Sequence, residues 1–384
     1  MKRRIALTVA LAAIVIGATA LAAERGVTLP SGWLLPAPQV AAVATGTMPQ
    51  GIALSPDEKR LAVIESGVGP AALRILDVPS LKLERVIKLK GAFGKPVWRD
   101  IDTALVAGGN ADAVLTVNVN DGTVAESPVG KDRWPAAVAL RVSDGTIATA
   151  NDGDATVSLV ASGAVRTIPV GGHPSDLAFS TDGQTLYVAC RGDSSVRVIR
   201  LNGSFVTRVP VGKHPSALAL SLDGATLFVA NGDDDSISKI NTKTLAPVGT
   251  IELHPYYGVR LEHEYSTRPT ENAVAYGALP NSLLINHGRL YVTLGGANTV
   301  ATISAGRIVA TAPTGWFPTG AAVATDGTIY VSDGKGEGSP ANPLYDPLHR
   351  QHTDQYVAMI TIGSVRAISH SLTNHEVSLV NVLP

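Results

Sequence analysis

Two adjacent stretches of similar sequence decide the fold. Residues 171–212 read GGHPSDLAFSTDGQTLYVACRGDSSVRVIRLNGSFVTRVPVG, and residues 212–251 read GKHPSALALSLDGATLFVANGDDDSISKINTKTLAPVGTI. Each copy contains four apolar runs of strand length separated by turn signals. Asp182-Gly183 predicts a hairpin turn in the first copy, because glycine accepts the positive φ of tight turns. Four short antiparallel strands in about 40 residues correspond to one blade of a β-propeller.

The same unit recurs along the chain. Its marker is a proline that opens the first run, with the spacings 47, 39, 39, 41, 65 and 38 between Pro49, Pro96, Pro135, Pro174, Pro215, Pro280 and Pro318. Seven copies predict an all-β fold, a seven-bladed β-propeller of four-stranded antiparallel blades. We expect residues 39–45 to close the ring as the outer strand of the last blade. Residues 356–382 would supply its third strand, although 377–382 could compete for the outer edge.

The N-terminus has the three parts of a secretory signal. Lys2-Arg3-Arg4 is followed by an apolar run over 5–21 and by Ala20-Leu21-Ala22, a cleavage pattern. We therefore predict a signal peptide at 1–22, a lead-in at 23–38 and the propeller at 39–384. This predicts an exported protein, periplasmic or secreted, with no membrane span after cleavage. The alternative is a retained anchor, since the run is close to the roughly 17 residues that a span requires.

Composition narrows the classes of function. The chain has 384 residues, 45% of them hydrophobic, and a net charge of −1, which excludes a disordered chain and argues against nucleic acid as a partner. One cysteine excludes an intrachain disulfide. The patterns G-x-S-x-G, H-E-x-x-H and G-x-x-x-x-G-K-[ST] are missing from the sequence. We therefore assign no catalytic residue, expect no cofactor and expect a monomer.

Candidate binding residues lie around the repeated prolines. The loops that lead into the first strands should share a face with the loops after the second strands, and both insertions, about 254–277 and 334–354, fall on that face. We predict a ligand-binding collar there, made of Lys95, Arg99, Arg133, Trp134, His173, His214, Trp316 and Phe317. Such a mixture suits an anionic or ring-bearing ligand. The alternative is that these side chains pack between blades.

Metal and thiol chemistry receive weaker support. His349, His352 and Asp354 are weak candidates for a divalent metal, which stays open as a cofactor. Residues 231–235 (NGDDD) have the composition of a calcium loop but not the later glutamate of an EF-hand. Cys190 is expected to be a buried small side chain. We also expect a positive φ at Gly171, Gly212 and Gly315.

The repeat resembles a known family. The pattern G-x-x-P-x-x-x-A-x-S-x-D-G-x-x-L-Y-V-A, seen at 171–189 and 212–230, resembles the YVTN-type β-propeller repeat of bacteria and archaea. Residues 29–33, 314–319 and 334–343 resemble a subset in which an exported bacterial propeller precedes a phosphoesterase domain. That resemblance implies an exported seven-bladed propeller. We expect the phosphoesterase domain to be absent, so its activity is not carried over.

Three functions follow from these patterns. The first is an exported binding or interaction (scaffold) protein with a small-molecule ligand or a protein partner at the collar. The alternative is a metal-dependent hydrolase of the lactonase type, which would need converging carboxylates such as Glu65, Asp100, Asp102 and Asp176. The third is a polyanion binder, whose local basic patch would have to overcome the overall charge.

Overall fold

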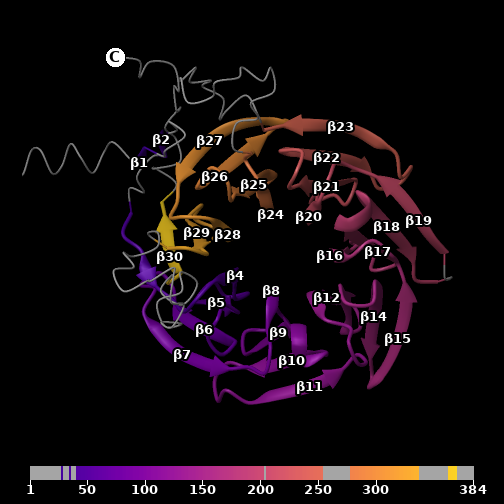
Figure 1. Cartoon of the computed structure of the whole chain (residues 1–384), viewed down its shortest axis with the longest axis horizontal. Helices are drawn as coiled ribbons and strands as arrows, with labels where there is room; N and C mark the ends of the chain where they lie inside the picture. Colours follow the sequence, from indigo (N-terminus) through magenta and orange to yellow (C-terminus); the bar gives the residue numbers. More distant parts are fainter. Residues whose placement is uncertain are drawn as a thin grey trace, which may run out of the picture.

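Seven four-stranded antiparallel sheets form a ring around a central axis (Figure 1). The computed structural model describes residues 27–28, 34–35, 40–202, 205–253, 277–336 and 362–369. The predicted signal at 1–22, most of both insertions and the segment 377–382 lie outside the described residues. The seven-bladed propeller predicted from the repeat is confirmed. No helix in the described part of the chain is long and apolar enough to cross a membrane.

The first four blades take their strands in chain order, from the axis outward. Blade one has β4 (Pro49–Leu54), β5 (Arg60–Glu65), β6 (Ala72–Asp77) and β7 (Leu83–Lys88). Blade two has β8 (Phe93–Trp98), β9 (Thr103–Ala107), β10 (Ala113–Asn118) and β11 (Val124–Pro128). Blade three has β12 (Pro135–Arg141), β13 (Thr146–Asn151), β14 (Thr156–Ala161) and β15 (Ala164–Pro169). Blade four has β16 (Pro174–Phe179), β17 (Thr185–Cys190), β18 (Ser195–Arg200) and β19 (Phe205–Pro210).

The remaining blades follow the same order until the seam. Blade five has β20 (Pro215–Leu220), β21 (Thr226–Asn231), β22 (Ser236–Asn241) and β23 (Pro247–Glu252). Blade six has β24 (Pro280–Asn286), β25 (Arg289–Leu294), β26 (Thr299–Ser304) and β27 (Arg307–Pro313). Blade seven combines β28 (Pro318–Val323), β29 (Ile329–Asp333) and β30 (Ser364–Ile368) with β3 (Val43–Ala44) from the other end of the chain. Minor elements are β1 (Val27–Thr28), its partner β2 (Leu34–Leu35), and the short helices η1 (Gly109–Ala111) and η2 (Arg191–Asp193).

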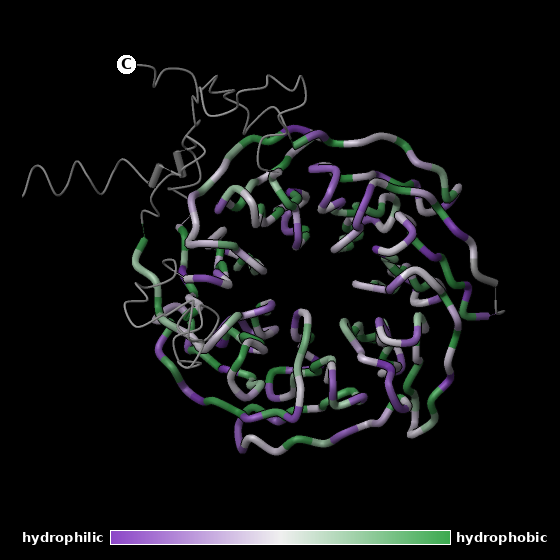
Figure 2. Tube along the Cα trace, in the orientation of Figure 1, coloured by the Kyte–Doolittle hydropathy of each residue, from purple (hydrophilic) through white to green (hydrophobic). Residues whose placement is uncertain are grey.

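The core lies between neighbouring sheets. The second strand of each blade is buried almost along its whole length, as in β17, whereas the outer strand β15 is largely exposed. Hydrophobic stretches therefore recur around the whole ring (Figure 2). Since both faces of an inner sheet are covered by apolar neighbours, burial of apolar surface between blades drives closure of the ring.

Blade two departs from the predicted alignment. In blade three, the opening proline Pro135 pairs with Asn151, the last residue of the second strand. In blade two, the last residue of the second strand is Ala107, and it pairs with Phe93. The prediction that Pro96 is the equivalent proline is therefore wrong. The reason is a larger bulge in β8: Phe93 and Val97 are four residues apart, but their partners Ala107 and Leu105 are only two apart.

The predicted glycine conformations are partly wrong. Gly171 has a φ of 72°, as expected, but Gly212 and Gly315 are not among the positive-φ residues. Close approach is what requires glycine at these two positions. A Cβ on Gly212 would lie 2.6 Å from the Asn231 side chain, and one on Gly315 would lie 2.4 Å from the carbonyl oxygen of Gly336.

Candidate functional site

One face of the ring carries the loops that lead into the first strands, and we call it the loop face. The start of each first strand pairs with the end of the second, as Pro174 does with Cys190, so the loops after the second strands share this face. Six blades place a non-glycine residue of positive φ directly before the first strand, namely Met48, Trp134, His173, His214, Leu279 and Phe317, with φ from 47° to 57°. Each such backbone costs about 1–2 kcal/mol relative to an ordinary one. Hydrogen bonds hold it in place, as from the Gly232 amide to the His214 carbonyl at 2.9 Å.

Trp134 of blade three is exposed but firmly held. The backbone amides of Asp132, Arg133 and Trp134 donate to the Asp112 carboxylate at 2.8, 2.8 and 2.9 Å. Burial acts to raise the pKa of Asp112, but these three hydrogen bonds outweigh it and the pKa is lowered. Trp134 as a whole residue is 42% exposed, and its ring meets the Phe93 ring edge-on, with centroids 6.4 Å apart. The loop therefore presents a fixed aromatic surface.

Blades four and five present histidines at the same position. His173 Nδ1 lies 3.2 Å from Asp152 Oδ1, and the other oxygen of Asp152 lies 2.6 Å from the Arg191 guanidinium. His214 Nδ1 lies 3.6 Å from Asp233 Oδ2. The His173 and His214 side chains are 65% and 48% exposed. Three consecutive blades thus offer a tryptophan and two histidines on the loop face.

The other aromatic residues of the predicted collar lie on blade seven and are half-buried. The Trp316 amide donates to the Gly336 carbonyl at 2.7 Å, and the Phe317 ring lies beneath the Lys335 ammonium, 5.4 Å from its centroid. Arg133 faces inward instead of toward solvent. Its Nη1 lies 2.6 Å from Thr167 Oγ1, so this guanidinium is part of blade three.

Two basic residues of the collar lie elsewhere. Arg99 follows β8 and its amide donates to the Thr103 carbonyl in the turn between the first two strands. That turn is at the opposite face of the ring, so the predicted placement of Arg99 is wrong. Lys95 sits in the enlarged bulge of β8, and its ammonium lies 3.7 Å from the buried Asp176 carboxylate of blade four. Lys95 therefore belongs to the first-strand layer around the axis. Both differences follow from the shifted register of blade two.

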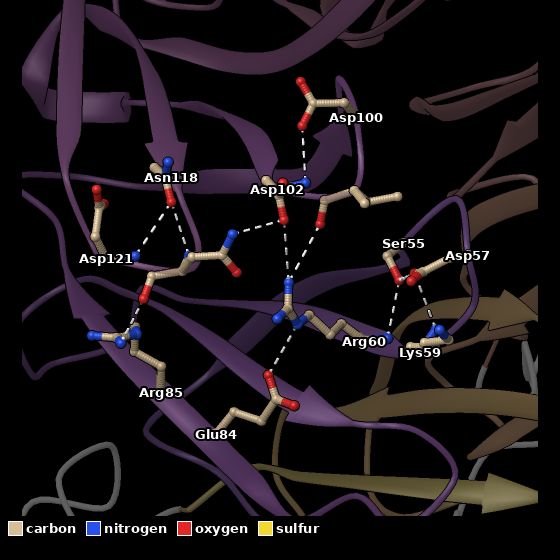
Figure 3. A network of polar contacts seen from close by, with 12 residues as sticks. Ser55, Asp57, Lys59, Arg60, Glu84, Arg85, Asp100, Asp102, Asn118 and Asp121 are labelled. Carbon is tan, nitrogen blue, oxygen red and sulfur yellow. Dashed lines mark hydrogen bonds and ion pairs between the residues drawn. The ribbon is translucent and has the colours of Figure 1, made fainter.

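The carboxylates that a hydrolase of the lactonase type would need do not converge. Asp100 and Asp102 lie at the face opposite the loop face, in a polar network where the Arg60 guanidinium lies 3.1 Å from Glu84 and 3.7 Å from Asp102 (Figure 3). Glu65 pairs instead with an arginine of its own blade. Within the residues that the structure describes, no group of three His, Cys, Asp or Glu side chains is placed to hold a metal. The candidates His349, His352 and Asp354 lie outside the described residues.

A hollow opens on the loop face at blade five. It measures about 860 Å³. Its wall includes acidic, hydroxyl and glycine residues: Gly212, Gly232, Asp233, Asp234, Asp235, Ser236, Ser238, Thr250, Glu252 and Gly277. The acidic turn at 231–235 was visible in the sequence, but its role in a hollow was not. The sequence could not predict the hollow, because its wall is built from segments that are far apart in the chain, between residues 210 and 279.

Comparisons with known proteins support the fold. A family model described as "Lactonase, 7-bladed beta-propeller" matches residues 120–246, and no curated protein matches the chain. Among solved structures, the chain is similar to a streptogramin B lyase (14% identity, TM-score 0.63, covering 86% of this chain and 97% of that one). It is also similar to virginiamycin B lyase from Staphylococcus aureus (14%, 0.62, 86% and 99%) and to Kuenenia stuttgartiensis hydrazine synthase (17%, 0.62, 87% and 99%). These likenesses and the blade count define the class, a seven-bladed β-propeller.

Proposed function

We propose that the protein is an exported binding protein that recognises a small-molecule ligand or a protein partner through its loop face. One observation carries this proposal: three consecutive blades present Trp134, His173 and His214 at equivalent positions on tightly held backbones. Exposed tryptophan is a frequent anchor of binding energy. A side chain that is already held in place loses little conformational entropy on binding. The export signal predicted at 1–22 supports the compartment.

The test is native mass spectrometry of the protein purified gently from its exported fraction. We expect a bound molecule or partner that is lost in the double variant His173→Ala/His214→Ala. His287→Ala is the matched control, because His287 is also exposed with a positive φ but lies in the turn between β24 and β25, on the opposite face. The proposal would be contradicted if the wild-type protein showed only the mass of the chain itself. It would also be contradicted if the double variant kept the same bound molecule.

A metal-dependent hydrolase of the lactonase type is the second candidate. It is favoured by the family model that matches residues 120–246. The described carboxylates do not support it, because Asp176 is taken up by Lys95 and by the Leu218 amide, 2.8 Å from its Oδ2. One bound divalent cation per chain, together with lactone hydrolysis that EDTA removes and Asp176→Asn abolishes, would replace the binding proposal with this one.

A further inference from the structure

Arginine guanidinium groups of the chain itself fill equivalent positions in three blades. The third residue of the third strand is Arg74 in blade one, Arg197 in blade four and Arg366 in blade seven. Arg74 pairs with Glu65, Arg197 donates to the Val170 carbonyl at 2.7 Å, and Arg366 lies 2.8 Å from Asp333. Each guanidinium joins the end of the second strand or the leading loop to the third strand. Three of the seven blades thus hold a guanidinium here, whereas blades two and six have Leu115 and Ala301 at the equivalent position.

Blade three also holds a guanidinium near this position, but from a different segment. Its third strand has Ser158 at this position, and the guanidinium comes from Arg133 in the leading loop. Arg133 donates to Thr167 Oγ1 at 2.6 Å and to Ser158 Oγ at 3.4 Å, and its Nε lies 3.5 Å from Asp154. Two hydroxyls and one carboxylate thus form a guanidinium seat.

Blade five has the same seat by register. Asn231 pairs with Ser236 as Asn151 pairs with Thr156, and Ser238 pairs with Thr250 as Ser158 pairs with Thr167. Counting from these pairs, the equivalents of Ser158, Thr167 and Asp154 are Ser238, Thr250 and Asp234. The Asp154 and Asp234 side chains are similarly accessible, at 33% and 34%.

The cation that would fill this seat is displaced. Lys213, not an arginine, stands one residue before the pre-proline position, where blade three has Arg133. Its ammonium is 76% exposed and only reaches 4.0 Å from Asp234. None of the residues that the structure describes places a guanidinium on Ser238 and Thr250. The region in front of Ser238 and Thr250 is instead part of the 860 Å³ hollow. Glu252 adds a further carboxylate to its wall, at the position that Pro169 occupies in blade three.

A buried amide beneath the hollow also has a missing partner. Asn231 Nδ2 donates to Ser236 Oγ at 3.0 Å and to Ser238 Oγ at 2.9 Å, and both serines line the hollow. Asn231 is fully buried, and its Oδ1 has no hydrogen-bond partner within the described part of the chain. Leaving such an atom unsatisfied costs about 1–3 kcal/mol. In blade three the equivalent atom, Asn151 Oδ1, accepts from the Thr149 hydroxyl and not from Arg133, so the missing partner of Asn231 reflects a difference within the second strand. The hollow itself is polar where Ser236 and Ser238 line it.

We propose that the hollow of blade five binds a guanidinium group, supplied by an arginine side chain in a peptide segment of a partner protein. This inference rests on the proposed binding function and names the chemistry of its ligand. A guanidinium carries five donors in a plane, which suits two hydroxyls and a carboxylate at the register positions that they hold in blade three. In blade five the Lys213 amide donates to Asp234 Oδ2 at 2.6 Å, so the ligand would share this carboxylate with the backbone. The flanking carboxylates Asp233 and Glu252 add charge-assisted attraction for a cationic ligand.

The test is isothermal titration calorimetry of the full protein with the peptide acetyl-Gly-Arg-Gly-amide. The matched probe replaces arginine by citrulline, which has the same shape without the charge. We expect binding of one arginine peptide per chain and at least tenfold weaker binding of the citrulline peptide. Ser238→Ala should weaken the arginine peptide, whereas Ser158→Ala, its counterpart in blade three, should not.

A second variant tests the seat without depending on the peptide. Lys213→Arg keeps the charge and places a guanidinium where Arg133 begins in blade three. We expect it to raise the melting temperature and to weaken peptide binding at least tenfold, because the chain then fills its own hollow. Equal binding of both peptides, no binding of either, or unchanged binding by a folded Lys213→Arg variant would overturn the inference. A collar-dependent adduct in native mass spectrometry would still leave the binding function standing.

Discussion

At the residue scale, Cys190 shows how position decides the chemistry of a thiol. It ends β17 and is fully buried. Burial, and secondarily the charge of Asp193, raises the pKa of Cys190 to about 12. Since the thiolate is the reactive form, the thiol should be inert at neutral pH.

We predict that Ellman's reagent leaves Cys190 unmodified in the native protein at pH 8 and modifies it fully after unfolding in guanidinium chloride. An Asn202→Cys variant supplies an accessible thiol as the control, since Asn202 is exposed in the turn after β18. Rapid reaction of one thiol in the native wild-type protein would refute this expectation.

A second residue-scale comparison concerns two equivalent asparagines. In blade three, the Thr149 hydroxyl donates to Asn151 Oδ1 at 2.8 Å, but in blade five the equivalent of Thr149 is Val229. Thr149→Val should therefore lower the free energy of unfolding by about 1–3 kcal/mol, because it leaves a buried acceptor unsatisfied. Val229→Thr should raise it, by up to about 1 kcal/mol.

Denaturant unfolding of both variants measures these two effects, because the midpoint and the slope of the transition together give the free energy of unfolding. The two substitutions exchange the same groups in opposite directions, so each controls for the change of side-chain shape in the other. Destabilisation of similar size in both variants would show that packing, not hydrogen bonding, governs this position.

At the element scale, the turn between the first and second strands repeats one hydrogen-bond pattern. In blade four, Ser180 Oγ donates to Asp182 Oδ1 at 2.5 Å, and the Gln184 amide donates to the same oxygen at 3.0 Å. Ser55 with Asp57 and Ser221 with Asp223 form the same pattern in blades one and five. The aspartate thus orders each hairpin as a hydrogen-bond acceptor.

These turns predict acid sensitivity. The serine hydroxyl, as the largest cause, holds the pKa of Asp57, Asp182 and Asp223 below the ordinary value of 3.8. A lowered folded-state pKa stabilises the fold above the unfolded pKa, and this contribution disappears as the pH falls through the folded pKa. Melting temperatures at pH 7, 4 and 3 should therefore fall most steeply below pH 4. The combined variant Asp57→Asn/Asp182→Asn/Asp223→Asn should show a shallower fall, and an equally steep fall would exclude these turns as the cause.

The same elements show what sequence can and cannot predict. Turn residues and apolar runs are local signals, so the hairpin at Asp182-Gly183 and the blade count followed from them. The bulge in β8 is not a local signal, because Pro96 imitates the repeated proline while Phe93 occupies its place. Placement of Trp134 and His173 on one face needed only strand polarity. The inward turn of Arg133 depends on Thr167, a partner 34 residues away, which no short-range pattern reveals.

At the scale of the whole molecule, the ring is held by contacts between its ends as well as between neighbouring blades. Each first strand packs against the next all the way round, including β28 against β4. A polar side chain next to the opening proline often donates to the proline carbonyl of the following blade, as Ser216 does to Pro280 at 2.8 Å. Thr319 does the same to Pro49 at 2.7 Å and so spans the seam. The seam is therefore built like the other junctions.

Closure in blade seven also depends on the short N-terminal strand β3. Val43 pairs with Val365 in β30, and the buried Arg366 donates to the Val40 carbonyl at 2.8 Å. A chain that starts at Gly46 loses these contacts, whereas a chain that starts at Val40 keeps them and serves as the reference. The hydrogen bond to the charged guanidinium alone contributes about 1.5–3 kcal/mol. At roughly 2 °C per kcal/mol for a large domain, the shorter chain should melt at least about 3 °C lower in calorimetry.

The same truncation can be tested by a second measurement, because removal of β3 exposes the edge of β30. Without β3, the edge of β30 presents unpaired backbone groups, and such an edge favours association between chains. Light scattering should therefore find more dimers or larger species for the chain that starts at Gly46 than for the reference. If both chains melt at the same temperature and stay equally monomeric, the pairing of β3 with β30 does not hold the ring closed. The contacts between β28 and β4, including the Thr319–Pro49 hydrogen bond, would then be sufficient for closure.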